Sequence, residues 1–403
     1  MEQVESTPKK LKLEKNQLGL VASLILANIV IGMDKSLIST AILPISTELN
    51  LDTGQSGLLM SLFFLGYSLM QIPSGWLADK KGSKIVLVAS LGIVSIFSFL
   101  FGISQSFTLL ILIRFIVGVG NSGFPPSSVK AVADNFEKNQ RTVVQSIVMA
   151  TGGLGAILAY TMGAYLISTN WRYGYFVESA LVLVALVMLL RFTPNHQVKE
   201  LSEIDRNKLS FLTILKDKSV YILFTAMLLL NFVLFGIQLW MPTYLNKEFG
   251  LTIGKISLIL SLISIMQIVV TVLAGLFLSK FFQKKEKLFI STTMSLTFVL
   301  ILAFMMSKNL TVSIILLFCI VFFAISAFTA MFAWPHQIFS KEVMGSKMGI
   351  INTGGTLGGF LAPVVMGYLI KIGNGSFGNA FIAMSVSALC CGITVLFYQD
   401  KNK

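Results

Sequence analysis

Long apolar runs separated by short polar connections occupy nearly the whole chain. Twelve runs of about 20 residues or more lie at residues 17–43, 54–78, 85–104, 107–132, 142–167, 172–192, 219–245, 254–278, 288–306, 311–338, 346–370 and 376–398. A helix needs about 20 apolar residues to cross a hydrocarbon core ~30 Å thick. The pattern therefore predicts an all-α membrane protein with twelve transmembrane helices.

Polar and glycine residues recur after about 200 residues. The first set is Gly75, Lys80 and Lys84, repeated as Gly275, Lys280 and Lys284; the second is Thr151-Gly152-Gly153, repeated as Thr353-Gly354-Gly355. Such a period indicates two pseudo-symmetric six-helix halves, as in secondary transporters. The longest polar connection divides the spans six and six. We expect an N-terminal half at 1–192, a cytoplasmic linker at 193–218 and a C-terminal half at 219–403.

Composition supports a membrane protein and explains the charge. Hydrophobic residues make up 55% of the chain and charged residues 12%, too few charges for a water-facing surface. The net charge of +13 comes mainly from Lys and Arg in the loops on the side of the two termini. Such an asymmetry predicts a multi-pass protein of the cell membrane with both termini in the cytoplasm, and no nucleic-acid partner. Three cysteines in apolar runs and two separated histidines indicate neither a metal site nor a cofactor.

A charged loop connects the second and third apolar runs. Its residues of interest are Gly75, Asp79, Lys80, Gly82 and Lys84. A carboxylate at Asp79 can accept from backbone N–H groups at a helix start and pair with cations. Gly75 and Gly82 are expected to permit the tight turn that a short loop requires. We expect this loop to be a conformational gate, with contacts that break when the halves move.

Five ionisable residues lie inside the predicted spans: Asp34, Lys35, Arg114, Lys130 and Glu178. A charge within the membrane is costly, so each needs a partner or a function. Asp34 and Lys35 are adjacent, so they point about 100° apart on a helix. In one interpretation Lys35 binds an anionic substrate and Asp34 takes a coupling proton; in the other, Asp34 forms a static ion pair with Arg114. For Glu178 we favour a structural hydrogen bond.

Several of these motifs are similar to those of one transporter family. The loop Gly75–Lys84 resembles the signature loop of the major facilitator superfamily, and Arg114-x-x-x-Gly118-x-Gly120 resembles its fourth-helix motif. The segment 123–136, GFPPSSVKAVADNF, looks like the anion:cation symporter branch, to which hexuronate and galactonate carriers belong. The resemblance covers the whole chain. It implies transport of a small organic anion between two rocking halves.

The chain departs from that branch at two positions. The branch usually has an Asp-Arg pair in the first helix, where this chain has Asp34-Lys35. The change keeps the charge but loses the planar guanidinium fork. The branch also commonly has a glutamate seven residues after the fourth-helix arginine, where this chain has Asn121. The second change removes a titratable group on which proton coupling would otherwise rest.

The resemblance also extends the candidate site. Tyr67 matches a substrate-contacting position of the branch, and Gln71 lies one turn further on the same face. The expected substrate-binding residues are Lys35, Tyr67, Gln71, Arg114, Asn121, Gln238, Asn352 and Thr353, with Asp34 as the proton-coupling residue. Each uncharged member could instead form a helix–helix hydrogen bond. Arg114 could bind the anion directly, or hold Asp34 and release it on protonation.

The sequence favours a secondary active transporter of a small organic anion, such as a sugar acid or another carboxylate. The expected mode is proton-coupled symport by a monomer in the lipid bilayer. The alternative is a major facilitator exporter of drugs or amphipathic compounds driven by proton antiport. Against the exporter, the fifth span carries Gly152-Gly153-Leu154-Gly155 without the Gly-Pro element typical of such antiporters. An enzyme is not indicated, since the spans contain no nucleophile–base set.

Overall fold

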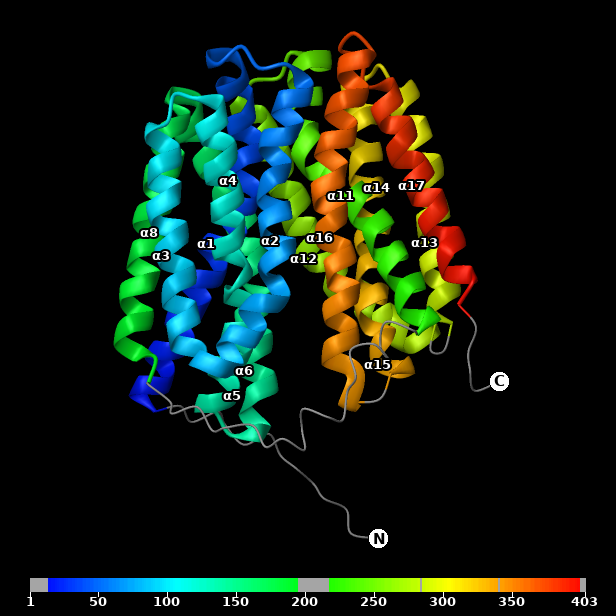
Figure 1. The fold of residues 1–403 in the computed structure, drawn as a ribbon. Coiled ribbons are helices and arrows are strands. Elements are labelled where there is room, and N and C mark those ends of the chain that lie inside the picture. The colour runs from blue at the N-terminus through cyan, green and yellow to red at the C-terminus, as the bar shows by residue number, and fades with distance from the viewer. Residues whose placement is uncertain (1–13, 195–216, 283–284, 340, 399–403) are drawn as a thin grey trace.

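The computed structural model describes residues 14–194, 217–282, 285–339 and 341–398. These residues form a bundle of helices and contain no strand (Figure 1). Twelve of the helical segments are long and apolar enough to cross a membrane. The predicted all-α architecture with twelve spans is confirmed.

The first six spans comprise α1 (Lys15–Glu48), α2 (Thr53–Lys81), α3 (Ser83–Ile103), α4 (Phe107–Ser122), α5 (Phe124–Asn135), α6 (Lys138–Ala150), α7 (Gly152–Met162), the π-helical turn η1 (Gly163–Ile167) and α8 (Trp171–Phe192). The other six comprise α11 (Lys218–Phe249), α12 (Ile253–Phe281), α13 (Glu286–Met306), α14 (Leu310–Ala333), α15 (Pro335–Ile338), α16 (Lys341–Ile372) and α17 (Gly378–Leu396). Most of the expected linker, residues 195–216, lies outside the described residues.

Three spans that the apolar pattern predicts as continuous helices are interrupted. The fourth breaks between α4 and α5 at Gly123, directly before Pro125 and Pro126 in the first turn of α5. Proline has no N–H group, so it fits the first turn of a new helix but not a helix interior. The fifth span divides into α6, α7 and η1, and the tenth into α14 and α15. Hydropathy alone does not reveal such breaks, because each break lies within one apolar run of the sequence.

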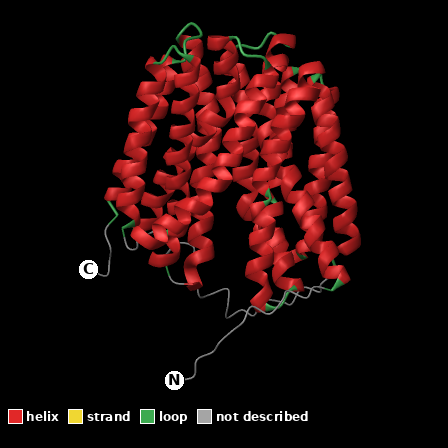
Figure 2. Ribbon diagram, turned by 180° about the vertical axis from the view of Figure 1, so that it is seen from behind, coloured by secondary structure: helices red, strands yellow, loops and turns green. Residues whose placement is uncertain are grey.

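The two halves meet toward the end of the bundle opposite the chain termini and diverge toward the end that carries them (Figures 1 and 2). The halves are joined mainly by the contacts of α2 with α16, of α1 with α11, and of α12 with α7 and η1. The asymmetry positions residues near the middle of α1, α2 and α11 at the interface between the halves.

Close helix packing within the N-terminal half depends on small residues. A Cβ atom at Gly118 of α4 would overlap the backbone carbonyl of Phe63 in α2. In lipid, helices associate through such close backbone approach, since there is little hydrophobic driving force between them. This contact supports the packing interpretation of the glycine-rich fourth span. It also fixes the side chains of α2 and α4 relative to each other.

Candidate functional site

A buried ion pair joins the first and fourth spans. Arg114 Nη1 of α4 lies 2.9 Å from Asp34 Oδ1 of α1, and Asn121 Nδ2 donates to Asp34 Oδ2 at 2.9 Å. Asp34 and Arg114 are at most 1% exposed. The Arg114 guanidinium also lies over the Phe63 ring, 4.9 Å from its centroid. The ion pair considered from the sequence is therefore present, and it fits both the static pair and the role in which Arg114 holds Asp34 until protonation.

Lys35 has a different environment from its neighbour Asp34. Its side chain is half-buried, and its Nζ atom lies 4.8 Å from the centroid of the Tyr67 ring. Among the described residues, no carboxylate lies within ion-pair distance of it. The next residue, Ser36, accepts a hydrogen bond from Gln238 Nε2 of α11 at 3.1 Å. Lys35 thus lies beside a contact between the halves, while Asp34 points into the N-terminal half.

The remaining predicted binding residues are less closely connected. Gln71 Oε1 and Asn352 Oδ1 are buried carbonyl oxygens without a donor in the described part of the chain. The Thr353 hydroxyl donates to Gly349 O of its own helix at 2.9 Å, which satisfies its donor. No hydrogen bond among the described residues links these three side chains to Lys35. Their roles in binding stay predictions.

The structure adds two residues that the sequence reasoning missed, Ser36 and Tyr160. The Tyr160 hydroxyl of α7 lies near the side chains of Ser39, Ser36 and Gln238. Tyr160 and Gln238 also line a small pocket between the halves, together with Gln267 of α12. Hydroxyl residues in apolar runs usually bond to their own helix, so the sequence alone gives no signal for this role.

The charged loop is well defined at the end that carries the termini. Asp79 Oδ1 lies 4.0 Å from Lys130 Nζ of α5, and Lys80 Nζ lies 4.7 Å from the Trp76 ring centroid. Both contacts stay within the N-terminal half. Gly82 ends α2 with φ 93°, so the expected need for glycine in the turn is met there. The expectation for Gly75 is wrong, because α2 continues to Lys81 and Gly75 lies inside the helix. Lys84 is in the first turn of α3.

Contacts at the opposite end close one side of the interface. The Thr53 hydroxyl of α2 donates to Gly367 O of α16 at 3.0 Å, and Lys371 Nζ lies 3.0 Å from Asp52 Oδ2. A Cβ atom at Gly57 would overlap the backbone carbonyl of Pro363. Sequence reasoning did not anticipate this closure, since its polar residues lie at span ends where charges are common.

Asp52 contributes to the closure in two ways. Its carboxylate accepts from the Gln55 backbone N–H at 2.9 Å, which caps α2, and it pairs with Lys371. The Gln55 N–H and the Lys371 ammonium hold the pKa of the Asp52 carboxyl below its usual range. A lowered pKa means that the stabilisation is present above the usual value and is lost as the pH falls through the lowered one. The closure should therefore withstand mild acid.

Replacing Asp52 by asparagine should favour opening at this end. Asparagine keeps the helix cap, so only the ion pair with Lys371 is lost. An exposed pair contributes about 0.2–1 kcal/mol, which corresponds to an increase of up to about fivefold in the open population. The open population would be measured from the distance between spin labels at residues 47 and 372. The labels would be introduced in a background without the three native cysteines. Asp134→Asn, which removes a pair within one half, is the control. If lowering the pH to about 5 opens the wild type as much as Asp52→Asn does, this account of the closure is wrong.

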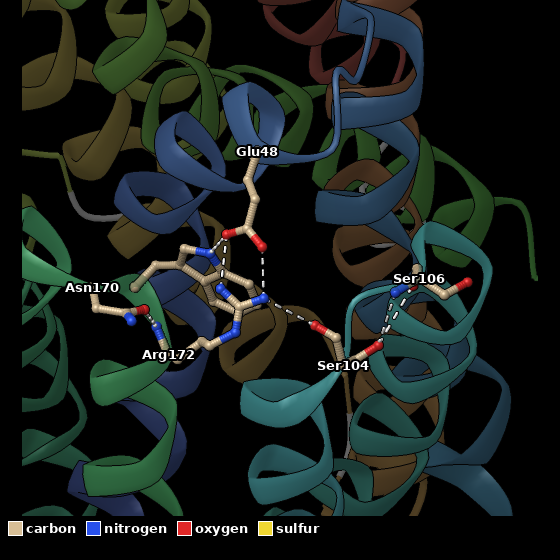
Figure 3. Close-up of polar contacts among 6 residues, drawn as sticks. Glu48, Ser104, Ser106, Asn170 and Arg172 are labelled. Carbon is tan, nitrogen blue, oxygen red and sulfur yellow. Dashed lines mark hydrogen bonds and ion pairs between the residues drawn. The ribbon is translucent and has the colours of Figure 1, made fainter.

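A second polar cluster ties the N-terminal half together at the same end (Figure 3). Arg172 of α8 binds both carboxylate oxygens of Glu48 at 2.6 and 2.7 Å, and the Trp171 indole N–H donates to Glu48 at 2.7 Å. Arg172 Nη2 also reaches Ser104 O after α3, at 3.5 Å. Such bidentate arginine–carboxylate pairs are geometrically specific. The cluster links α1, α8 and the end of α3.

A helical membrane protein with two six-span halves, a one-sided closure and charges buried near the interface has the architecture of a secondary transporter. The chain belongs to the Major Facilitator Superfamily, which it matches over residues 24–363. Its curated relatives belong to the anion:cation symporter branch, so the resemblance inferred from the motifs is confirmed.

Two relatives and one solved structure illustrate the match. The chain is 25% identical to the hexuronate transporter of Bacillus subtilis (strain 168), covering 95% of this chain and 94% of that protein. It is 26% identical to the cis,cis-muconate transport protein of Acinetobacter baylyi (strain ATCC 33305 / BD413 / ADP1), covering 94% and 93%. The fold is similar to a bacterial homologue of the human lysosomal transporter Spinster, with TM-score 0.79, 17% identity and 96% coverage of both chains.

Proposed function

We propose that this protein transports a small organic anion, a sugar acid or another carboxylate, by proton-coupled symport. The observation that carries the proposal is the contrast between two cations of the spans, the buried Arg114 and the half-buried Lys35. Arg114 is neutralised by Asp34, whereas Lys35 has only the Tyr67 ring as a close partner among the described residues. An ammonium group in that position needs an anion to compensate its charge. A bound carboxylate supplies one.

The relatives support an anionic substrate. One is named a hexuronate transporter and another a cis,cis-muconate transport protein. Both names denote compounds with carboxylate groups, which fits a single ammonium group flanked by polar side chains. Gln238 and Tyr67 are the groups best placed to contact the rest of the substrate. The Tyr67 ring lies next to the Lys35 ammonium group, and Gln238 donates a hydrogen bond to the neighbouring Ser36.

Asp34 is the proposed coupling residue. When Asp34 is ionised, it holds Arg114 and Asn121 within the N-terminal half. Protonation would remove the charge that holds Arg114, which changes the balance between conformations of the transporter. The closed end, with Asp52 and Lys371, corresponds to the outside of the cell if the termini are cytoplasmic. The halves then alternate by rocking about the contacts around Ser36 and Gln238.

Uptake into proteoliposomes tests the function. A thermal-shift screen with sugar acids, dicarboxylates, amino acids and lipophilic cations identifies the substrate class, because a ligand stabilises the state that it binds. The stabilising compound is then supplied outside vesicles with an imposed inward proton gradient. Accumulation above the equilibrium level, abolished by a protonophore, is the expected result. Stabilisation by lipophilic cations alone, with export against the gradient, would instead support a drug exporter.

A further inference from the structure

A glutamate in the sixth span lies outside the site described above and has no hydrogen-bond donor in the described part of the chain. Glu178 of α8 is 0% exposed, and neither of its carboxyl oxygens accepts a hydrogen bond from an N–H or O–H group of the described residues. The structural hydrogen bond expected from the sequence is therefore not formed there. A buried carboxylate without donors is very unfavourable, so such a group needs a proton or a cation.

The charged groups that act on Glu178 are the members of the buried ion pair. Its carboxyl group interacts with both Asp34 and Arg114 and lies within hydrogen-bonding reach of the Asp34 carboxyl. Two carboxylates cannot hydrogen-bond to each other unless one carries a proton. Arg114 keeps two donors, Nε and Nη2, without a partner. The arrangement therefore contains two acids, one guanidinium and unused donors.

Few other ionisable groups face this cluster. The helices and turns packed against α8 are α1, α3 and η1. The α1 helix contributes Asp34, with Lys35 turned toward the interface between the halves. The α3 helix has one charged side chain, Lys84, which lies in its first turn. The η1 turn has no charged residue, and the side chain of its one ionisable residue, Tyr165, is 79% exposed. On α8 itself, the buried Tyr175 hydroxyl interacts with Glu178 and Arg114 and has no hydrogen-bond partner.

We propose that Glu178 and Asp34 share one buried proton and act as a two-carboxyl relay around Arg114. In the observed arrangement Asp34 is ionised against Arg114, and the proton resides on Glu178, so the three groups are neutral together. In the relay step an O–H bond breaks at Glu178 and forms at Asp34, while Arg114 exchanges Asp34 for the Glu178 carboxylate. The net charge is unchanged, and Arg114 is never left unpaired. Asp34 then releases the proton to water, and one proton from water reloads the pair.

This relay rests on the proposed proton coupling. It explains how such coupling can operate although residue 121 is an asparagine, which cannot titrate. The Asn121 amide occupies the second oxygen of Asp34 at 2.9 Å and cannot titrate. Without another acid, protonating Asp34 would leave the Arg114 charge buried and uncompensated. Glu178 supplies that acid from a different helix. The relay therefore makes the buried pair reversible in a chain that has no acid at position 121.

Transport by Glu178→Gln tests the relay. Glutamine keeps the size of the side chain but cannot give up a proton. The ratio of proton-driven accumulation to substrate counterflow should fall at least about tenfold relative to the parent, because counterflow requires no net proton movement. Glu286→Gln, a change of the same kind at a buried glutamate that starts α13, should keep the parental ratio. A parental ratio in Glu178→Gln contradicts the relay alone, whereas a parent without proton-driven accumulation contradicts the proposed function.

Infrared spectroscopy tests the proton itself without a substrate. At neutral pH the wild type should show the band of a protonated carboxyl group in a dry environment. The band should shift when glutamate is labelled with ¹³C at its side-chain carboxyl, and it should disappear in Glu178→Gln. The label works in the wild type, so the test stands even if the variant does not fold. A band that does not shift on labelling of glutamate, or that persists in Glu178→Gln, overturns the proposal.

Discussion

Replacing Lys35 by alanine should raise the substrate Kd by a factor of about 30 or more. The ammonium group is the cation at the interface that lacks a carboxylate partner among the described residues. Losing one partner of a largely buried charge pair costs about 2–5 kcal/mol, and 1.4 kcal/mol corresponds to a factor of ten. Isothermal titration calorimetry of the purified protein with its substrate would measure the change.

Two further variants distinguish charge recognition from a general defect. Lys35→Arg keeps a cation above the Tyr67 ring and should recover most of the lost affinity, although its planar group places the charge differently. Lys255→Ala removes an exposed lysine at the start of α12 and should leave the Kd unchanged. Unchanged affinity in Lys35→Ala would remove the basis of the proposed anion site.

Asp34→Asn should abolish proton-driven accumulation, leaving at most transport down the substrate gradient. The variant cannot take up a proton at this position, and it removes the carboxylate that binds Arg114 and Asn121. Paired measurements of substrate uptake and internal pH in proteoliposomes would show the loss. Asp134→Asn changes an aspartate at the C-terminal end of α5 and is the matched control. Retention of gradient-driven uptake by Asp34→Asn would exclude Asp34 as the coupling residue.

The same variant has an informative effect on stability. A buried ion pair that loses one partner usually costs about 3–5 kcal/mol, because the other charge is left uncompensated. If Glu178 can ionise beside Arg114, Asp34→Asn alone should lose much less than this. The double variant Asp34→Asn/Glu178→Gln leaves Arg114 without a carboxylate and should show the full loss in denaturant unfolding. Equal stabilities of the single and double variants would argue against exchange of the guanidinium between the two acids.

Much of the fold could be predicted because the membrane requires long apolar helices. Each span needs about 20 predominantly apolar residues, so the twelve runs identified the twelve spans directly. The helix breaks at Gly123 and after Ala150 were not predictable in this way, since each lies within a single apolar run of the sequence. The closure by Thr53 and Gly367 was also hidden, because it uses backbone carbonyls that any sequence provides.

The site was partly predictable for a related reason. Charges inside spans are rare, so Asp34, Lys35 and Arg114 stood out, and their different environments follow from the 100° between neighbouring residues. Glu178 stood out equally but was assigned a structural role, because the sequence does not show which helix faces which. Its proximity to Asp34 depends on the packing of α8 against α1. Ser36 and Tyr160 gave no signal, since hydroxyl groups are ordinary in such helices.

The cluster of Glu48, Trp171 and Arg172 constrains where movement can occur. It ties α8 to α1 at one end of the membrane, and Phe192 of α8 packs against Gly19 of α1 near the other. Two helices clamped at both ends travel as one body, so Asp34 and Glu178 keep their separation while the transporter cycles. The proton shared by Asp34 and Glu178 would then move with the N-terminal half as part of a rigid body. Release of this proton would depend on the position of the C-terminal half relative to the N-terminal half. The proton gradient would therefore drive transport through changes at the interface between the halves.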